Sequence, residues 1–130
     1  MGKIWGLALV ATIAMGLSGQ AQDRQSECMA IANVFAEAGR GYEMSADIGE
    51  AIKLTDRLIA GMKKLNLTDA KLKSLQGRYI NYFNSSNELL KKGQKAQNDE
   101  AALNALMDSA RASSLLGQRL GEELTQYCLQ

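Results

Sequence analysis

The sequence predicts an all-α protein, an up-down four-helix bundle with a terminus-to-terminus disulfide. Beyond residue 21 the chain has no proline and is rich in Ala, Leu, Lys, Gln and Glu, which lose little conformational freedom in a helix. Apolar residues recur there at spacings of three and four, and no segment alternates as a strand does. One cysteine lies near each end of this region.

Residues 1–21 have the pattern of a signal peptide, and residues 22–130 are the predicted helical domain. Lys3 gives a positive start, an apolar stretch follows, and the small residues Gly19 and Ala21 suit cleavage after position 21. The apolar stretch is shorter than the roughly 18 residues of a spanning helix, and an uncleaved anchor is the alternative. We expect a periplasmic or secreted protein that meets a membrane only through an uncleaved signal segment.

Cys28 and Cys128 are the only cysteines. An even count in an exported chain predicts a disulfide, which here would tie the start of the domain to its end. A catalytic thiol pair is the alternative. It is disfavoured because the chain has no C-x-x-C motif and no histidine that could lower the pKa of a thiol.

Four helices are expected, at about residues 26–39, 45–65, 68–95 and 98–127. Ser45 and Thr68 are the expected N-caps of the second and third helices, since hydroxyl oxygens accept hydrogen bonds from first-turn N–H groups. Gly39 and Gly41 should separate the first two helices, because glycine costs about 1 kcal/mol inside a helix.

This glycine break and the disulfide support each other. In an up-down bundle the chain ends meet only when the number of helices is even. Without the break there would be three helices, and the cysteines would lie beyond the roughly 7 Å between Cα atoms that a disulfide can bridge. Together the two features favour four helices.

The core of the last two helices is predicted from their antiparallel register. Equal steps from a turn near Gln97 place Phe83 opposite Arg111 and Tyr79 opposite Leu115. The bulky cluster of Tyr79, Tyr82 and Phe83 would then face the small residues between positions 110 and 117, because large against small fills a core without voids. The alternative is that this small-residue segment is left open as a pocket.

Several chemistries are excluded by what the sequence lacks. Without histidine there is no usual general base, metal ligand or haem ligand, and we expect no cofactor and no metal site. Loss of Lys3 with the signal peptide leaves 14 basic against 14 acidic residues, so no nucleic-acid partner is expected.

Acidic and basic clusters are expected to lie on solvated surfaces. The pairs Asp99–Glu100 and Glu122–Glu123 are adjacent, so their side chains diverge around a helix, and an enzyme built on carboxylates alone is the least favoured function. A basic run around the second turn suggests an anionic partner or lipid surface, but a solvated bundle end is favoured because the net charge is near zero. This run comprises Lys53, Arg57, Lys63, Lys64, Lys71, Lys73 and Arg78.

Cys28, residues 65–72 (LNLTDAKL) and residues 123–128 (ELTQYC) resemble small exported bacterial helical-bundle proteins of unassigned function. This resemblance implies a compartment and a fold but no activity. Residues 65–70 also resemble the first motif of the periplasmic LTxxQ-motif chaperones, which shelter unfolded clients without ATP. At the glutamine position of that motif this chain has Lys71 in one copy and Cys128 in the other.

Together these features predict a non-enzymatic, exported helical interaction module with no catalytic residues and, as partner, another protein. The alternative is an ATP-independent periplasmic chaperone or envelope-stress protein. That alternative requires exposed apolar surface on the folded protein.

Overall fold

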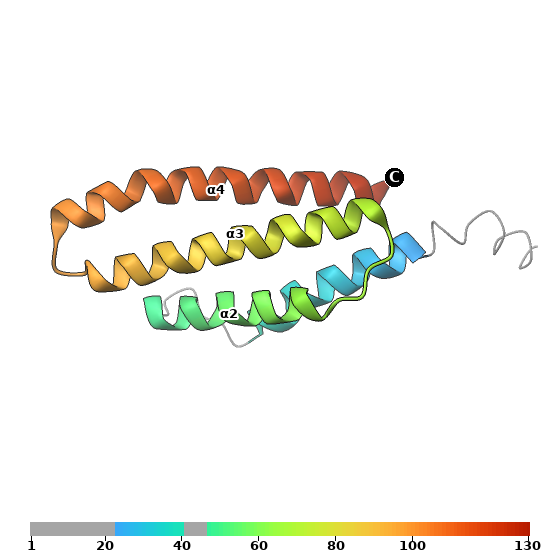
Figure 1. The fold of residues 1–130 in the computed structure, drawn as a ribbon, viewed down its shortest axis with the longest axis horizontal. Helices are drawn as coiled ribbons and strands as arrows, with labels where there is room; N and C mark the ends of the chain where they lie inside the picture. Colours follow the sequence, from blue (N-terminus) through green and yellow to red (C-terminus); the bar gives the residue numbers. More distant parts are fainter. Residues whose placement is uncertain (1–22, 41–46) are drawn as a thin grey trace, which may run out of the picture.

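A computed structural model describes residues 23–40 and 47–130, which form four helices and no strand (Figure 1). The first helix covers residues 23–39 of the described chain, and it is followed by α2 (Ile48–Lys64), α3 (Ala70–Lys95) and α4 (Glu100–Leu129). The predicted all-α helical bundle is confirmed. None of the helices within these residues is long and apolar enough to cross a membrane.

The central element is α3, which packs against α2 on one side and α4 on the other, whereas α2 and α4 do not pack against each other. Figure 1 shows the first helix starting beside the C-terminal end of α4 and running diagonally to α2. Val34 of the first helix packs against Gly61 of α2, and Phe35 packs edge-to-face on Tyr79 of α3, 5.4 Å between ring centroids. The bundle is therefore complete only at the end where the disulfide lies.

Aspartate caps the start of each of the last three helices. Asp47, Asp69 and Asp99 each accept a hydrogen bond from the backbone N–H three residues ahead, at 2.9 to 3.1 Å. The expectation that Thr68 caps α3 is therefore wrong. Likewise α2 begins at Ile48 behind Asp47, and the predicted cap Ser45 lies outside the described residues.

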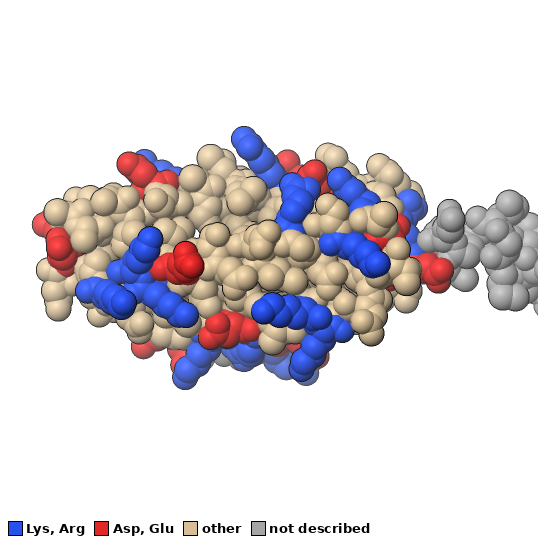
Figure 2. All heavy atoms as spheres, in the orientation of Figure 1, with Lys and Arg blue, Asp and Glu red and all other residues tan. Residues whose placement is uncertain are grey.

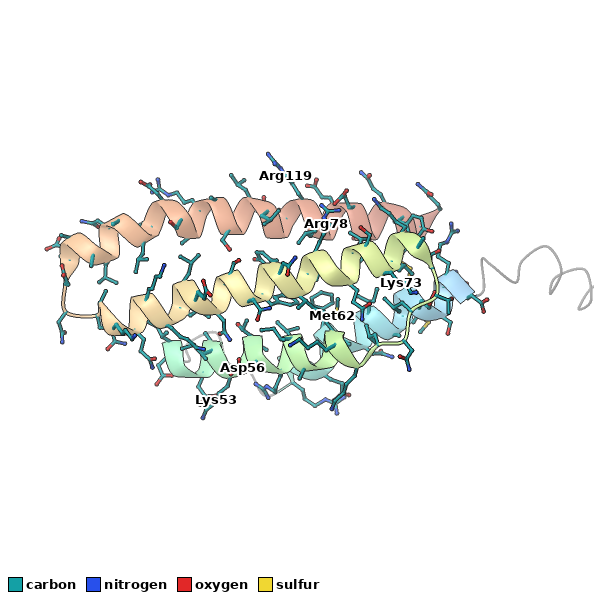
Figure 3. All side chains as sticks on the ribbon, in the orientation of Figure 1. Lys53, Asp56, Met62, Lys73, Arg78 and Arg119 are labelled. Atoms are coloured by element: carbon teal, nitrogen blue, oxygen red, sulfur yellow. A yellow bond between two sulfur atoms is a disulfide. The ribbon has the colours of Figure 1, made fainter. Side chains whose placement is uncertain are left out.

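The core lies between the first helix, α2, the N-terminal half of α3 and the C-terminal half of α4. Met62 points from α2 into this interior (Figure 3), and Ile31 of the first helix is fully buried beside it. Burying an aliphatic side chain of this size contributes about 1.5–3 kcal/mol, so the packing of these residues is the main stabilising force. The buried cluster comprises Ile31, Met62, Leu67, Leu72, Leu75, Tyr79, Phe83 and Leu120.

The predicted register between α3 and α4 is wrong by about five residues, nearly one and a half helical turns. Tyr82 lies against Gly117, and the hydroxyls of Ser86 and Ser113 are 3.3 Å apart. Counting equal steps fails because each side chain leans toward the N-terminus of its own helix, which in antiparallel helices displaces the contacts. Phe83 does not face α4 but packs with Phe35 of the first helix.

Two polar side chains fix α3 against α2. Gln76 donates from its amide to the carbonyl oxygens of Met62 (2.6 Å) and Leu65 (3.1 Å), at the end of α2 where carbonyl groups lack the N–H partner of a continuing helix. Further along, the amide of the buried Asn87 donates to Asp56 at 2.6 Å. Because buried polar groups need partners, these bonds favour one register of the two helices.

The predicted disulfide joins Cys28 of the first helix to Cys128 of α4, with 6.0 Å between their Cα atoms. The first helix ends at residue 39 and Arg40 forms a turn, as the glycine break predicts, while Gly41 lies outside the described residues. The disulfide thus closes the bundle at one end only.

Replacing both Cys28 and Cys128 with serine should lower the free energy of unfolding by roughly 4–5 kcal/mol, because the bridge restricts a loop of about 100 residues in the unfolded chain. Urea denaturation at neutral pH measures the change. A reductant should reproduce the loss in the wild type and leave the double variant unaffected. Equal denaturation midpoints for oxidised and reduced wild type would contradict this expectation.

Alanine at Gly117 and at Gly77 should have opposite effects. A Cβ at Gly117 would lie 2.5 Å from the hydroxyl oxygen of Tyr82, whereas one at Gly77 would meet no atom within 4 Å. Gly77→Ala should therefore stabilise by up to about 1 kcal/mol through helix propensity. The change in stability for Gly117→Ala should be less favourable than that for Gly77→Ala by at least about 1 kcal/mol, because the new Cβ meets Tyr82. Gly117→Leu should overpack the site and destabilise the protein by about 1–3 kcal/mol. Equal thermal stability of the two alanine variants would refute the register.

Candidate functional site

The carboxylates singled out in the sequence do not converge on a reaction site. Asp99 caps α4, and Glu123 turns toward α3, where it binds Arg78 at 2.5 Å and Lys71 at 3.7 Å. Hydrogen bonding and charge from Arg78, with the charge of Lys71, hold the pKa of Glu123 below its ordinary value against partial desolvation. Within residues 23–40 and 47–130, no three cysteine or acidic side chains are grouped as metal ligands would be.

The basic run around the second turn is distributed over several surfaces. Lys71 and Arg78 are held by Glu123, and Lys53 is paired with Glu50 at 3.3 Å. Figure 2 shows acidic and basic side chains interleaved on the visible face, without a large patch of one sign. This distribution favours the solvated surface that the sequence predicts over a binding site for an extended anion.

A polar network surrounds the disulfide. Glu27 of the first helix accepts hydrogen bonds from the backbone N–H groups of Thr68 and Asp69 and from the Thr68 hydroxyl. Tyr127 of α4 donates from its hydroxyl to Asp69 at 2.7 Å, and the guanidinium of Arg24 lies 5.3 Å from the centre of the Tyr127 ring. Three segments far apart in the sequence are thereby joined at the N-terminus of α3.

The network shifts two pKa values in opposite directions. Burial opposes ionisation of Asp69, but hydrogen bonds from Tyr127 and from backbone N–H groups, with the charge of Arg24, bring the pKa of Asp69 below its ordinary value. The hydrogen bond to Asp69, followed by desolvation, raises the pKa of Tyr127. The network therefore stabilises Asp69 as the carboxylate and Tyr127 as the neutral phenol, the two forms that hydrogen-bond to each other. This is a structural role for both residues.

The strongest candidate for a binding site is an apolar groove at the opposite end of the bundle. It has a volume of about 420 Å³ and lies between α3, α4 and the first turn of α2. Leucines and a methionine form most of its wall, and the hydroxyls of Ser86 and Ser113 lie at its base. The main apolar lining residues are Ile48, Leu89, Leu90, Leu103, Leu106 and Met107.

The half of α4 beside this groove is exposed on several sides. Met107 is 52% exposed, Leu115 56% and Leu116 44%, which is unusual for large apolar side chains on a helix packed in a bundle. Between Glu100 and Arg119 only two residues are charged. These apolar side chains make this half of α4 the part of the described chain where a partner could cover the most apolar surface.

The groove exists because the first helix covers α4 only near the disulfide. Tyr82 fills the space at Gly117, as the sequence predicts for its small residues, but Ala110 and Ser114 remain on the open groove wall. The sequence left open whether aromatic side chains of α3 fill the small-residue segment or leave it as a pocket, and the structure shows it filled at Gly117 and open at Ala110 and Ser114. The feature of the sequence that indicates an open groove is the low charge of residues 101–118.

A second groove, of about 470 Å³, lies between the first helix and α2. Its floor is made of small residues such as Ala38 and Gly61, and its edges carry Arg57, Lys64 and Glu37. It offers less apolar contact to a ligand than the leucine-lined groove on α4, because hydrophobic stabilisation scales with the apolar area removed from water.

Tyr127→Phe should destabilise the protein in a pH-dependent way. The contribution of Asp69 is fully present above its unfolded pKa of about 4 and is lost as the pH falls through its lower folded pKa. The contribution of Tyr127 is present below about pH 10 and is lost as the pH rises through its higher folded pKa. The stability gap to wild type should be widest between about pH 5 and 9 and narrow on either side.

Thermal unfolding from about pH 2 to 11 measures this gap. Tyr82→Phe is the matched control, since no hydrogen bond within the described residues includes its hydroxyl, and its effect should not vary over the acid range. A Tyr127→Phe effect of constant size from acid to neutral pH would show that the bond to Asp69 does not stabilise the fold.

No family model matches this sequence, and no curated protein and no solved structure matches it at a significant level. What the α4 groove binds must therefore be argued from its shape and lining.

Proposed function

We propose that this protein is a non-enzymatic, exported interaction module that holds an amphipathic helix of another exported protein in the groove between α3 and α4. The observation that carries the proposal is the apolar groove itself, which occupies the position where a bundle helix would lie against α4. A helix docking its apolar face into such a groove is a recurrent mode of recognition.

The lining of the groove suits a helix as ligand. The walls of the groove are α2 and α4, which do not pack against each other, and its floor is α3. Neighbouring helix axes lie about 8–10 Å apart, so a guest helix between these walls would make the contacts that the first helix makes at the disulfide end. Leu103, Leu106 and Met107 would then leave water, and each such burial is favourable.

Export is supported by two features. The pattern of residues 1–21 is that of a signal peptide. The disulfide is compatible with an oxidising compartment, where such bonds persist. A periplasmic or secreted location follows as part of the proposal.

A second candidate function is that of an ATP-independent chaperone, and the exposure of Met107, Leu115 and Leu116 favours it. A chaperone of this class presents apolar surface in its folded state and binds many unrelated clients. It should bind an apolar fluorescent dye when folded and suppress aggregation of unfolded proteins, whereas a module with one partner need not.

Photo-crosslinking in living cells tests the proposal. A photoreactive residue at Met107, in the groove, should capture one dominant protein, whereas the same residue at Lys73 should not, because Lys73 is exposed on α3 near the disulfide end (Figure 3). Ala110→Trp should fill the groove and remove most Met107 adducts, while Lys73→Trp serves as the matched control.

Mass spectrometry of the captured material separates the candidates. One dominant partner lost on filling the groove supports the interaction module. A broad set of unfolded proteins supports the chaperone. Adducts of equal yield and identity from both positions, or adducts insensitive to Ala110→Trp, would remove the groove as the binding site.

A further inference from the structure

The face of α4 turned away from α3 carries a distinct pattern of charge. From position 100 to position 119 the charged residues are Glu100, Asp108, Arg111 and Arg119, and all four are exposed. At 100° per residue they fall within one arc of about 100°, opposite the residues that face α3, such as Leu106 and Leu120. Figure 3 shows Arg119 pointing away from the rest of the bundle.

The order of signs along this stripe is acidic in its first half and basic in its second. Glu100 and Asp108 precede Arg111 and Arg119, and the two pairs are placed symmetrically about the point between Ser109 and Ala110. Two separate copies can slide along each other until side-chain tips, not Cα atoms, lie opposite, and one offset suits both pairs because they share a centre. An identical stripe running antiparallel would therefore set Asp108 against Arg111 and Glu100 against Arg119, twice each. The stripe is complementary to itself and to no uniformly charged surface.

We propose that the outer face of α4 is a homodimer interface, in which the α4 helices of two copies pack antiparallel over residues 100–119. The paired segment would be about 28 Å long at 1.5 Å per residue. This inference is independent of the proposed function, because it uses the face of α4 opposite α3 and not the lining of the groove.

Apolar and small side chains on the same face suit close packing. Leu115, 56% exposed, lies at the centre of the stripe, and in the antiparallel register it meets Asn104 of the other copy. Ala101 and Ala112 lie at the edge of the stripe, where their short side chains let the two backbones approach. Close approach of this kind helps to fill an interface without voids.

The monomer makes little use of these charges. Asp108 and Arg111 are spaced three residues apart, as are the paired Glu37–Arg40 and Glu50–Lys53, yet no ion pair among the described residues includes any of the four charges of the stripe. In the dimer each would face an opposite charge. Since the contact is isologous, association closes at two copies and does not continue into filaments.

Charge exchange tests the proposal directly. In Asp108→Arg both central positions become basic, and in Arg111→Asp both become acidic, so each single variant should be monomeric where the wild type is dimeric. An equimolar mixture of the two should form a heterodimer, because each then meets its opposite. The double variant Asp108→Arg/Arg111→Asp should recover the homodimer.

Sedimentation velocity of the full chain, over about 1 to 500 μM at low and high salt, measures these states. Salt should weaken the wild-type dimer, because these are surface charges. Arg57→Asp on α2 is the matched control and should leave association unchanged. Circular dichroism checks that each variant is folded, which an exposed charge change should preserve.

Three results would overturn the inference. The first is a wild type that stays monomeric throughout the concentration range. The second is a dimer that the single variants do not weaken, which would place the interface on another face. The third is a pair of single variants that dissociate but fail to pair on mixing, which would indicate another register.

Discussion

The attachment of the first helix to the end of α4 is the constraint on which the rest of the structure depends. The Cys28–Cys128 bridge fixes one end of the first helix beside α4, and Val34 seats the helix on Gly61 of α2. From the bridge the first helix runs diagonally away from α4 toward α2 (Figure 1). It therefore seals one end of the bundle and leaves α4, at the other end, with α3 as its one neighbouring helix among those described. The apolar groove and the exposed half of α4 are consequences of that path.

Polar contacts reinforce the same constraint. Glu27 satisfies N–H groups at the start of α3, and the Tyr127–Asp69 bond joins α4 to that start, so three chain segments are held around one helix terminus. Each such hydrogen bond contributes modestly to the free energy of folding. Removing one partner costs more, because the remaining polar group must be hydrated again or stay unpaired. Together they specify one arrangement of the helices near the disulfide. No comparable set of polar contacts ties α4 to α3 near their connecting turn, where the Ser86–Ser113 pair is the furthest contact described.

The number of helices, their approximate ends and the disulfide could be predicted because they depend on local spacing and on two cysteines. The N-cap of α3 could not, because Thr68 and Asp69 are both good acceptors, and the choice between them follows from Glu27, 41 residues away from Thr68. The register of α3 and α4 also required the direction in which side chains lean. The sequence could not decide between a filled segment and an open groove, because the apolar spacing of α4 continues unchanged from Leu103 to Leu120, although only its latter part has neighbours beyond α3. Periodicity shows which face of a helix is apolar, but not whether anything covers it.

The one-sided closure of the bundle implies a gradient of cooperativity along the molecule. Near the disulfide, residues of all four helices share one packed core, so their amide protons should exchange with solvent mainly through global unfolding. Toward the turn at residues 96–99, α3 and the start of α4 form a two-helix hairpin whose opening exposes little of that core. Amides there should exchange through local fraying, at free energies well below the global value. A ligand or second copy that packs on this hairpin should therefore slow amide exchange at the tip of the hairpin first. The melting temperature of the core should change little.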